Sequence, residues 1–467
     1  MPCRASYLLL LSVVLLAPLP FGSVEALWVT AWCVLLAVSV GLFDVRHIPS
    51  SELRPLLPFL ALGALFLGVA AAQALLSPWP MAWWTGGAPP TGAFPRPSAA
   101  AGNVSTPWLS LGPALAGLMS FIASYVVSTD RGRAERLLKA IGLSGAAYAA
   151  YGIASLLIDP SSILWAEKTA YVGYLTGTFI NRNTAATYFG SCAILWLSLS
   201  LSQVQQQLRA SRHSSGASWA DLRPTRALMG SLSGFLVCLV ALFLTASRAG
   251  ILLSAAILVG VLALFFRRSF PRGARSILAI VGLFMAAALA LEFMGGLVAL
   301  RIASSGLIDE ARWLTYMATL AAILDHPWLG TGLGTFTEVF PAYRPAELST
   351  TGRWDHAHSS PLQLALELGI PFFVAAFAVW THALIRLVRG ALSRRRGVKF
   401  PVAAAGVLLL GTLHSVVDFS LQIPGYAIVF AAVVGCGLAQ AQRSYGSAVH
   451  TRPRWGPAAG EPAVSQP

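Results

Sequence analysis

Long uninterrupted apolar runs recur from one end of the sequence to the other, and the segments between them hold almost all of the charged residues. Crossing the hydrocarbon core of a bilayer takes about 20 residues of helix, and many of these runs reach that length. Strands of a membrane β-barrel are only about 10 residues long and alternate in polarity, so this pattern excludes a barrel. The sequence therefore predicts an all-α polytopic membrane protein with about twelve transmembrane helices.

Twelve apolar runs are predicted to span the membrane. The first run follows Arg4, and the sequence Val-Glu-Ala, which ends at Ala26, comes after it. Together these features imitate a cleaved secretory signal. A second apolar run, from Leu27 to Phe43, comes directly afterwards, and we therefore favour an uncleaved first span. The predicted spans are residues 5–22, 26–43, 55–76, 109–128, 137–158, 184–204, 229–246, 249–266, 277–298, 361–386, 400–418 and 423–441.

The distribution of charge predicts how these spans are oriented. The chain has 32 Lys and Arg against 18 Asp and Glu, a net charge of +14, and only 11% charged residues. With both termini inside, 24 of the 32 cations fall on inner segments, as the positive-inside rule requires. The basic composition is thus a topology signal and does not indicate binding to nucleic acid. The cations left outside are Arg96, Lys168, Arg182, Arg248, Arg301, Arg312, Arg344 and Arg353.

Three predicted outside segments are longer than a tight turn: residues 77–108, 159–183 and 299–360. The first is rich in Pro, Gly and Trp, which predicts an irregular loop. In the third, apolar residues from Asp309 to Asp325 recur at helical spacing and predict an amphipathic helix lying on the membrane. The tail after Arg443 is rich in Pro, Gly and Ala, a composition typical of disorder.

Three polar clusters on the outer side each open a helix that runs inward. Asn183, Ser247 and Ser360 are the expected N-caps. A helix N-terminus attracts anions, and the guanidinium groups of Arg182 and Arg248 have a fork geometry that suits phosphate. The sequence thus predicts a site for a phosphate-bearing lipid ligand. The clusters are Asn181-Arg182-Asn183-Thr184, Thr245-Ala246-Ser247-Arg248 and His356-Ala357-His358-Ser359-Ser360-Pro361.

Each of these features also has a structural explanation. Arginines at span ends commonly anchor a helix at the membrane interface, and Asp418 has nearby arginines as candidate partners. The glycine run of residues 330–334 follows a helix and lacks the Lys and Ser/Thr of a phosphate loop, so it does not predict a nucleotide site. The five cysteines are scattered and indicate neither a metal site nor a disulfide framework.

Several sequence blocks occur in order between residues 176 and 369. They are Thr176-Gly-Thr-Phe-Ile-Asn-Arg-Asn-Thr184, Leu244-Thr-Ala-Ser-Arg-Ala-Gly250, Asp325-His-Pro-Trp-Leu-Gly-Thr-Gly-Leu-Gly-Thr-Phe336, and His358 with Leu362-Gln-Leu-Ala-Leu-Glu-Leu-Gly369. This succession resembles the O-antigen ligase and O-antigen polymerase (Wzy-type, WaaL-like) superfamily of bacterial inner membranes. A last stretch, from His414 to Pro424, resembles members that are linked to capsule or exopolysaccharide.

The resemblance implies a GT-C-like membrane fold in three parts: N-terminal spans in residues 1–175, a ligase- or polymerase-like core in 176–424, and a last span with a cytoplasmic tail in 425–467. It implies a glycosyltransferase whose active face is periplasmic. The donor would be an undecaprenyl-diphosphate-linked glycan. The acceptor would be a lipid A-core sugar or a growing glycan, and membrane lipids would surround the enzyme. The resemblance implies no cofactor and no metal.

The resemblance also implies roles for individual residues. His358 matches the family's outer-loop histidine and would be the catalytic base, while Arg182 and Arg248 would bind the diphosphate. The family usually has Asn after that histidine, whereas this chain has Ser359, so His356 is a competitor. The remaining candidates for supporting roles are Asn181, Asn183, Arg312, Arg344 and Glu367.

Simple chemistry agrees with these roles and leaves alternatives open. A departing diphosphate needs stabilisation of its developing charge, and a sugar hydroxyl needs a base such as histidine. A single displacement implies inversion at the anomeric carbon. A lipid-linked glycan flippase or another transporter is the main alternative, a non-catalytic scaffold is a third, and the sequence does not separate ligase from polymerase.

Overall fold

The computed structural model describes residues 4–44, 46, 48–76, 107–211, 223–267, 282, 310–348, 354–394 and 397–442. These residues are mostly helical, and within them eight helices are long and apolar enough to cross a membrane. The eight are α4 (Leu57–Leu76), α6 (Pro107–Val127), α7 (Arg131–Ile158), α8 (Arg182–Ser211), α9 (Arg226–Leu244), α10 (Arg248–Phe266), α14 (Ser360–Ser393) and α16 (Pro424–Gln442). Three shorter apolar helices are α1 (Arg4–Leu16), α2 (Ala26–Gly41) and α15 (Lys399–His414).

These helices occupy eleven of the twelve predicted spans, and of the remaining one, residues 277–298, the structure describes only Gly282. Two helices end four or more residues earlier than predicted. The first stops at Leu16 because Pro18 and Pro20 follow, and proline cannot donate the backbone hydrogen bond that a helix needs. α15 stops at His414, four residues before the predicted end, where the chain enters a tight turn. The number of spans therefore stays a prediction. The tail after Arg443 and residues 77–106 of the predicted irregular loop 77–108 lie outside the described residues, while Pro107 and Trp108 belong to α6.

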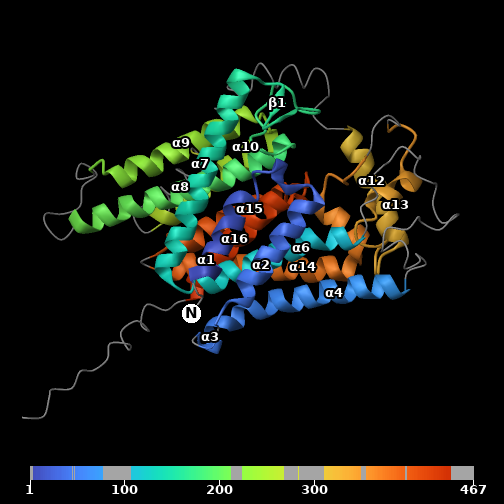
Figure 1. Ribbon diagram of the computed structural model, residues 1–467, viewed down its shortest axis with the longest axis horizontal. Helices are drawn as coiled ribbons and strands as arrows, with labels where there is room; N and C mark the ends of the chain where they lie inside the picture. The colour runs from blue at the N-terminus through green and yellow to red at the C-terminus, as the bar shows by residue number, and fades with distance from the viewer. Residues whose placement is uncertain are drawn as a thin grey trace, which may run out of the picture.

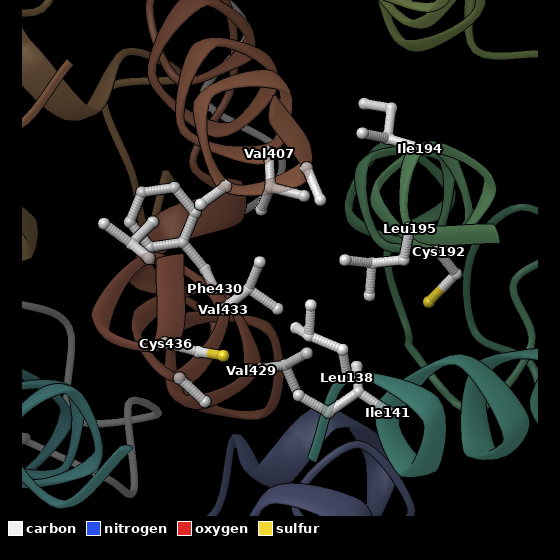
Figure 2. Close-up of a cluster of buried hydrophobic side chains, with 14 of the residues drawn as sticks. Leu138, Ile141, Cys192, Ile194, Leu195, Val407, Val429, Phe430, Val433 and Cys436 are labelled. Carbon is white, nitrogen blue, oxygen red and sulfur yellow. The ribbon is translucent and has the colours of Figure 1, made fainter. Parts of the chain in front are cut away.

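The centre of the molecule is built around α8 and α16, whose membrane-length stretches are almost entirely buried. Figure 2 shows side chains of α7, α8, α15 and α16 meeting in this centre, among them Leu138, Cys192, Val407 and Val433. Small residues let the helices of α16 and α6 approach closely: a Cβ atom at Gly435 would lie 2.5 Å from the carbonyl oxygen of Phe121. Small residues at helix contacts are the usual means of close packing within membranes.

Hydrogen bonds join helix ends that the charge distribution predicts to lie on the same side. At the predicted inner end, the amide of Gln440 donates to the carbonyl oxygen of Ser128 at 2.6 Å, joining α16 to the end of α6. At the opposite end, which we call the outer end, Gln73 of α4 donates to the carbonyl oxygen of Leu329 at 2.6 Å. Figure 1 shows α12 (Glu310–Asp325) and α13 (Phe336–Tyr343) together at one end of the molecule, on the right. Short elements complete the description: η1 (Phe21–Ser23), α3 (Ser50–Leu53), η2 (Arg54–Leu56), η4 (Ser420–Gln422), and the antiparallel pair β1 (Ser162–Ile163) and β2 (Ala166–Glu167).

Helix α12 confirms the helix predicted for residues 309–325. One face of it, with Ala318 and Ala322, is buried with α13 and the start of α14. The opposite face exposes a stripe of large apolar side chains at helical spacing: Trp313, Met317, Leu320 and Leu324. This exposed stripe is the face that a membrane surface would cover.

Helix α14 is broken at Gly369, whose φ of 85° and ψ of 159° are not helical, and Pro371 follows. The residues after α12 wrap around this break: Ile370 donates its backbone N–H to the carbonyl oxygen of Pro327 at 2.8 Å. Gly330 has a φ of 72°, and a Cβ atom there would lie 2.5 Å from the carbonyl oxygen of Leu366. The close approach of residues 330–334 to α14 therefore explains why this segment needs glycine. A nucleotide-binding role is not required to account for it.

Candidate active site

Helix α8 presents Arg182 at its first position. The side-chain Oδ1 of Asn181 accepts the backbone N–H of Asn183 at 2.7 Å, so Asn181 caps this helix. The expectation that Asn183 is the cap is wrong, because the helix begins one residue earlier than its apolar pattern suggests. The amide of Asn183 is used differently, as a donor to the carboxylate of Asp418.

The guanidinium of Arg182 is buried, with only 7% of the residue exposed. It lies over two aromatic rings, 4.6 Å from the ring centre of Tyr174 and 5.3 Å from that of Tyr171. Its Nε and Nη1 atoms are shielded from solvent and have no hydrogen-bond partner among the described residues. Cation–π contact offsets part of the cost of burying the charge, but it leaves these two donors unsatisfied.

Helix α10 presents Arg248 in the same way as α8 presents Arg182. Ser247 is the N-cap, as predicted, and its Oγ accepts the backbone N–H of Gly250 at 3.4 Å. Arg248 itself is half-buried. A Cβ atom at Gly250 would lie 2.6 Å from the Cβ of Ala186, so the first turn of α10 packs directly on the second turn of α8. The two arginines therefore start adjacent helices at the outer end.

The third polar cluster leads into α14. The N-cap is Ser359, and its side chain makes no capping hydrogen bond. The predicted cap Ser360 is wrong by one residue, because Ser360 is already helical and Pro361 follows it within the first turn. His358 has a φ of 52°, in the left-handed region, and its carbonyl oxygen accepts the Oη–H of Tyr316 from α12 at 3.0 Å.

Backbone strain recurs at the outer end. Tyr171, Ala246 and His358 all have φ between 50° and 57°, a conformation that costs a non-glycine residue about 1–2 kcal/mol. Tyr171 contacts Arg182, and Ala246 lies two residues before Arg248. Strain of this kind persists only where the surroundings hold it, and it concentrates at functional sites.

The two histidines share one aromatic neighbour. The ring of His356 stacks on Phe419 with centres 4.2 Å apart, and the ring of His358 meets Phe419 edge-on at 5.2 Å. Burial lowers the pKa of His356 from its ordinary value, although the nearby charges of Asp355 and Asp418 oppose the shift. His356 is therefore neutral, and able to accept a proton, at a lower pH than an exposed imidazole.

A cavity of about 920 Å³ lies between α4, α6, α14, α15 and α16. Its walls within the bundle are apolar and include Phe66, Leu118, Trp380 and Phe430. Most of its polar lining lies toward the outer end and includes Ser110, Asp355, His356, Ser360, Gln363, Glu367, Ser415 and Gln422. His356 lines this cavity, whereas His358, Arg182 and Arg248 are not part of its lining.

The remaining candidate residues differ in what they contact. Glu367 is buried and holds the glycine run, because its carboxylate accepts the backbone N–H of Gly334 at 2.9 Å and the amide of Gln363 at 3.0 Å. Arg312 of α12 donates from Nη1 to the carbonyl oxygen of Val417 at 3.2 Å. Arg344 follows the last residue of α13 and is half-buried.

Asp418 is the residue whose contacts the sequence did not predict. It is almost completely buried, and its carboxylate accepts hydrogen bonds from the side-chain amides of Asn183 and Asn181, the latter at 3.5 Å. Its partners are thus the two amides that flank Arg182, in place of the arginine pairing considered from the sequence. The stretch from His414 to Pro424 was a signal that this turn has a role, but its partners are more than 200 residues away in the chain.

Among the described residues, no group of three or more His, Cys, Asp or Glu side chains is placed to hold a metal ion. The described part of the site offers buried arginine, histidine, helix N-termini and amide groups. These groups bind anions and transfer protons.

Comparison with known proteins identifies one part of the chain. No curated protein matches the chain in sequence. Residues 233–377 match the family model described as O-antigen ligase. The match contains Arg248, both histidines and Glu367, while Arg182 and Asp418 lie outside it. This match supports the resemblance to the O-antigen ligase and polymerase superfamily, and it does so over residues 233–377.

Proposed function

We propose that the protein is a glycosyltransferase that moves a glycan from undecaprenyl diphosphate to a hydroxyl group of an acceptor. The acceptor is either a lipid A-core sugar, as for a ligase, or the end of another lipid-linked glycan, as for a polymerase. The reaction takes place at the periplasmic side of the bacterial inner membrane. It proceeds with inversion and without a metal ion.

The observation that carries this proposal is the state of Arg182. A buried cation normally has an anionic partner, because removing a charge from water is costly. Among the described residues, two buried donor atoms of Arg182 have no hydrogen-bond partner, and Arg182 lies at a helix N-terminus, where the helix dipole disfavours a cation and favours an anion. A bound diphosphate would accept hydrogen bonds from both donor atoms and would place negative charge at the helix N-terminus. Arg248, at the start of the adjacent helix, supplies a second cation.

The cavity supports a lipid as the substrate. Its apolar walls lie within the helix bundle, and its polar lining includes a histidine near the outer end. A polyprenyl chain is apolar and long, whereas the sugar and phosphate that it carries are polar. The cavity has the same division between apolar and polar surfaces.

The proposed reaction is a single displacement. The acceptor hydroxyl oxygen attacks the anomeric carbon, and the bond from that carbon to the phosphate oxygen breaks. The electron pair leaves with the diphosphate, whose developing charge is stabilised by Arg182 and Arg248. The hydroxyl proton passes to His358, the histidine that matches the family motif, with His356 as the competing base.

The test uses the full-length protein, purified in nanodiscs with an undecaprenyl-diphosphate-linked glycan and two acceptors, lipid A-core and a second lipid-linked glycan. We expect transfer to one of them and release of undecaprenyl diphosphate, with equal rates in the presence and absence of EDTA. Movement of the lipid-linked glycan across the bilayer without any transfer would overturn the proposal in favour of a transporter.

A further inference from the structure

The turn between α15 and α16 contacts both the start of α8, which carries Arg182, and the segment with the two histidines that leads into α14. We define the 415–420 turn as residues Ser415–Ser420. Its neighbours are the start of α8, which carries Arg182, the start of α14, which follows the histidines, and α12. These contacts come from both the backbone and the side chains of the turn.

The contact with α8 is made by Asp418. One carboxylate oxygen accepts the amide of Asn183 and the other accepts the amide of Asn181 at 3.5 Å. Because Asn181 also caps the helix, this carboxylate fixes both residues next to Arg182. A second link runs from Ser420, whose Oγ lies 3.2 Å from the Oγ1 of Thr187 one turn further along α8.

The contacts with α14 and α12 come from the backbone of the same turn. Ser360 donates twice to this turn. Its backbone N–H donates to the carbonyl oxygen of Ser415 at 2.8 Å, and its Oγ–H donates to the carbonyl oxygen of Asp418 at 3.4 Å. Arg312 donates to the carbonyl oxygen of Val417 at 3.2 Å. The start of α14 is therefore held two residues after His358.

Phe419 brings the histidines to the same turn. Its ring stacks on His356 and meets the edge of His358, at 4.2 Å and 5.2 Å between ring centres. Its backbone N–H donates to the carboxylate of Asp418 at 2.7 Å. The neighbouring residues Asp418 and Phe419 thus connect the arginine side of the site with the histidine side.

We propose that the 415–420 turn positions the phosphate-binding arginine and the histidine base relative to each other, with Asp418 and Phe419 as the positioning residues. This inference rests on the proposed glycan transfer. Neither residue touches the reacting atoms: Asp418 acts through Asn181, Asn183 and hence Arg182, and Phe419 acts through the two imidazole rings. A misplacement of about 1 Å in a reacting group can cost 10²-fold in rate, so loss of either contact should be visible in turnover.

The test compares Asp418→Asn and Phe419→Leu with Gln440→Ala, a control that removes a buried hydrogen bond at the other end of α16. All are assayed as full-length protein in nanodiscs for kcat, KM for the lipid-diphosphate glycan, and thermal midpoint. Asp418→Asn replaces a carboxylate oxygen by a donor that faces other donors, and it should raise KM by about tenfold and lower kcat. Phe419→Leu should lower kcat by about tenfold with KM changed less than twofold, whereas Phe419→Tyr, which keeps the ring, should restore most of kcat.

The outcomes separate this inference from the function on which it rests. The proposed function fails if the wild type transfers no glycan. The positioning role fails if the wild type is active and Arg182→Ala is inactive, but Asp418→Asn and Phe419→Leu keep wild-type kcat and KM as Gln440→Ala does. It also fails if both variants lose activity only because they no longer fold, since the turn would then be a purely structural element.

Discussion

Two buried cations occupy the same position on two helices at opposite ends of the molecule. Lys399 is the first residue of α15 at the inner end, and Arg182 is the first residue of α8 at the outer end. Both are nearly inaccessible to solvent, with 5% and 7% of the residue exposed. The dipole of a helix disfavours a cation at its N-terminus in both cases, so each needs compensation from elsewhere.

The compensation differs. Lys399 forms an ion pair with Glu135 at 2.9 Å, and Lys139 pairs with the same carboxylate at 3.0 Å. Arg182 lies over two tyrosine rings and has two buried donor atoms without partners among the described residues. A buried cation that is paired with a carboxylate of the protein needs only a structural role to explain it. A buried cation without such a partner is available to bind an anionic ligand. Lys399 thus has its anionic partner within the protein, whereas the donors of Arg182 fit the anion that we propose as a ligand.

The largest expected effect concerns the arginines. Arg248→Ala and Arg182→Ala should each reduce kcat/KM for glycan transfer by about 10²-fold or more, because each removes a cation from the departing diphosphate. Arg248→Lys should rescue only partly, since a point charge does not reproduce a two-pronged phosphate contact. The measurement is turnover in nanodiscs together with the amount of protein in the membrane, which should not change. Full activity in an alanine variant would return that arginine to the role of a membrane anchor.

The histidines should give the next largest effect. His358→Ala should cost about 10²-fold in kcat while donor binding is retained, and His356→Ala should cost much less. Wild-type activity should fall on acidification, because a protonated imidazole cannot accept a proton.

The pH profile distinguishes the two histidines. Since burial lowers the pKa of His356, activity that depends on His356 should persist to a pH below the ordinary imidazole value of about 6.5 before it falls. Normal activity of His358→Ala beside an inactive His356→Ala would show that His356 is the base. Normal activity of both variants would exclude the histidine mechanism.

The inner cation should affect stability and leave transfer intact. Lys399→Met leaves Glu135 with Lys139 as its remaining partner, and it should lower the unfolding free energy by about 1–2 kcal/mol, because Glu135 is one-third exposed and partly solvated. The thermal midpoint should fall by a few degrees while kcat and KM stay at wild-type values. Loss of transfer without loss of stability would contradict the division between a structural end and a ligand-binding end.

The smallest expected effect is the response to a simple anion. Inorganic pyrophosphate should raise the thermal midpoint of the wild type by a few degrees at saturation, because a ligand that binds only the folded state stabilises it. The same shift should appear in Lys399→Met and be absent in Arg182→Ala. An equal shift in all three proteins would mean that pyrophosphate binds elsewhere.

Local patterns in the sequence determined the helices and the residues placed at their outer starts. Apolar runs and capping residues act within one or two turns, so the positions of α8, α10 and α14 and the cap Ser247 could be predicted. The errors are also local: Asn181 and Ser359 replace the expected caps, because polar residues continue into the first turn of both helices. The exposed location of α12 on a membrane remains a prediction that its apolar stripe supports.

The tertiary structure alone decided which charges have partners. Asn183 and Asp418 are 235 residues apart in the chain, and Lys399 lies far from Glu135. No periodicity or spacing encodes such pairs, because they depend on which helices pack side by side. The same holds for the cavity, whose lining combines α4, α6, α14, α15 and α16, and for Phe419 beneath both histidines. The sequence by itself therefore determined which residues reach the outer end. Packing over long separations decided that Lys399 has an anionic partner, whereas Arg182 is buried with none in the part of the chain that the structure describes.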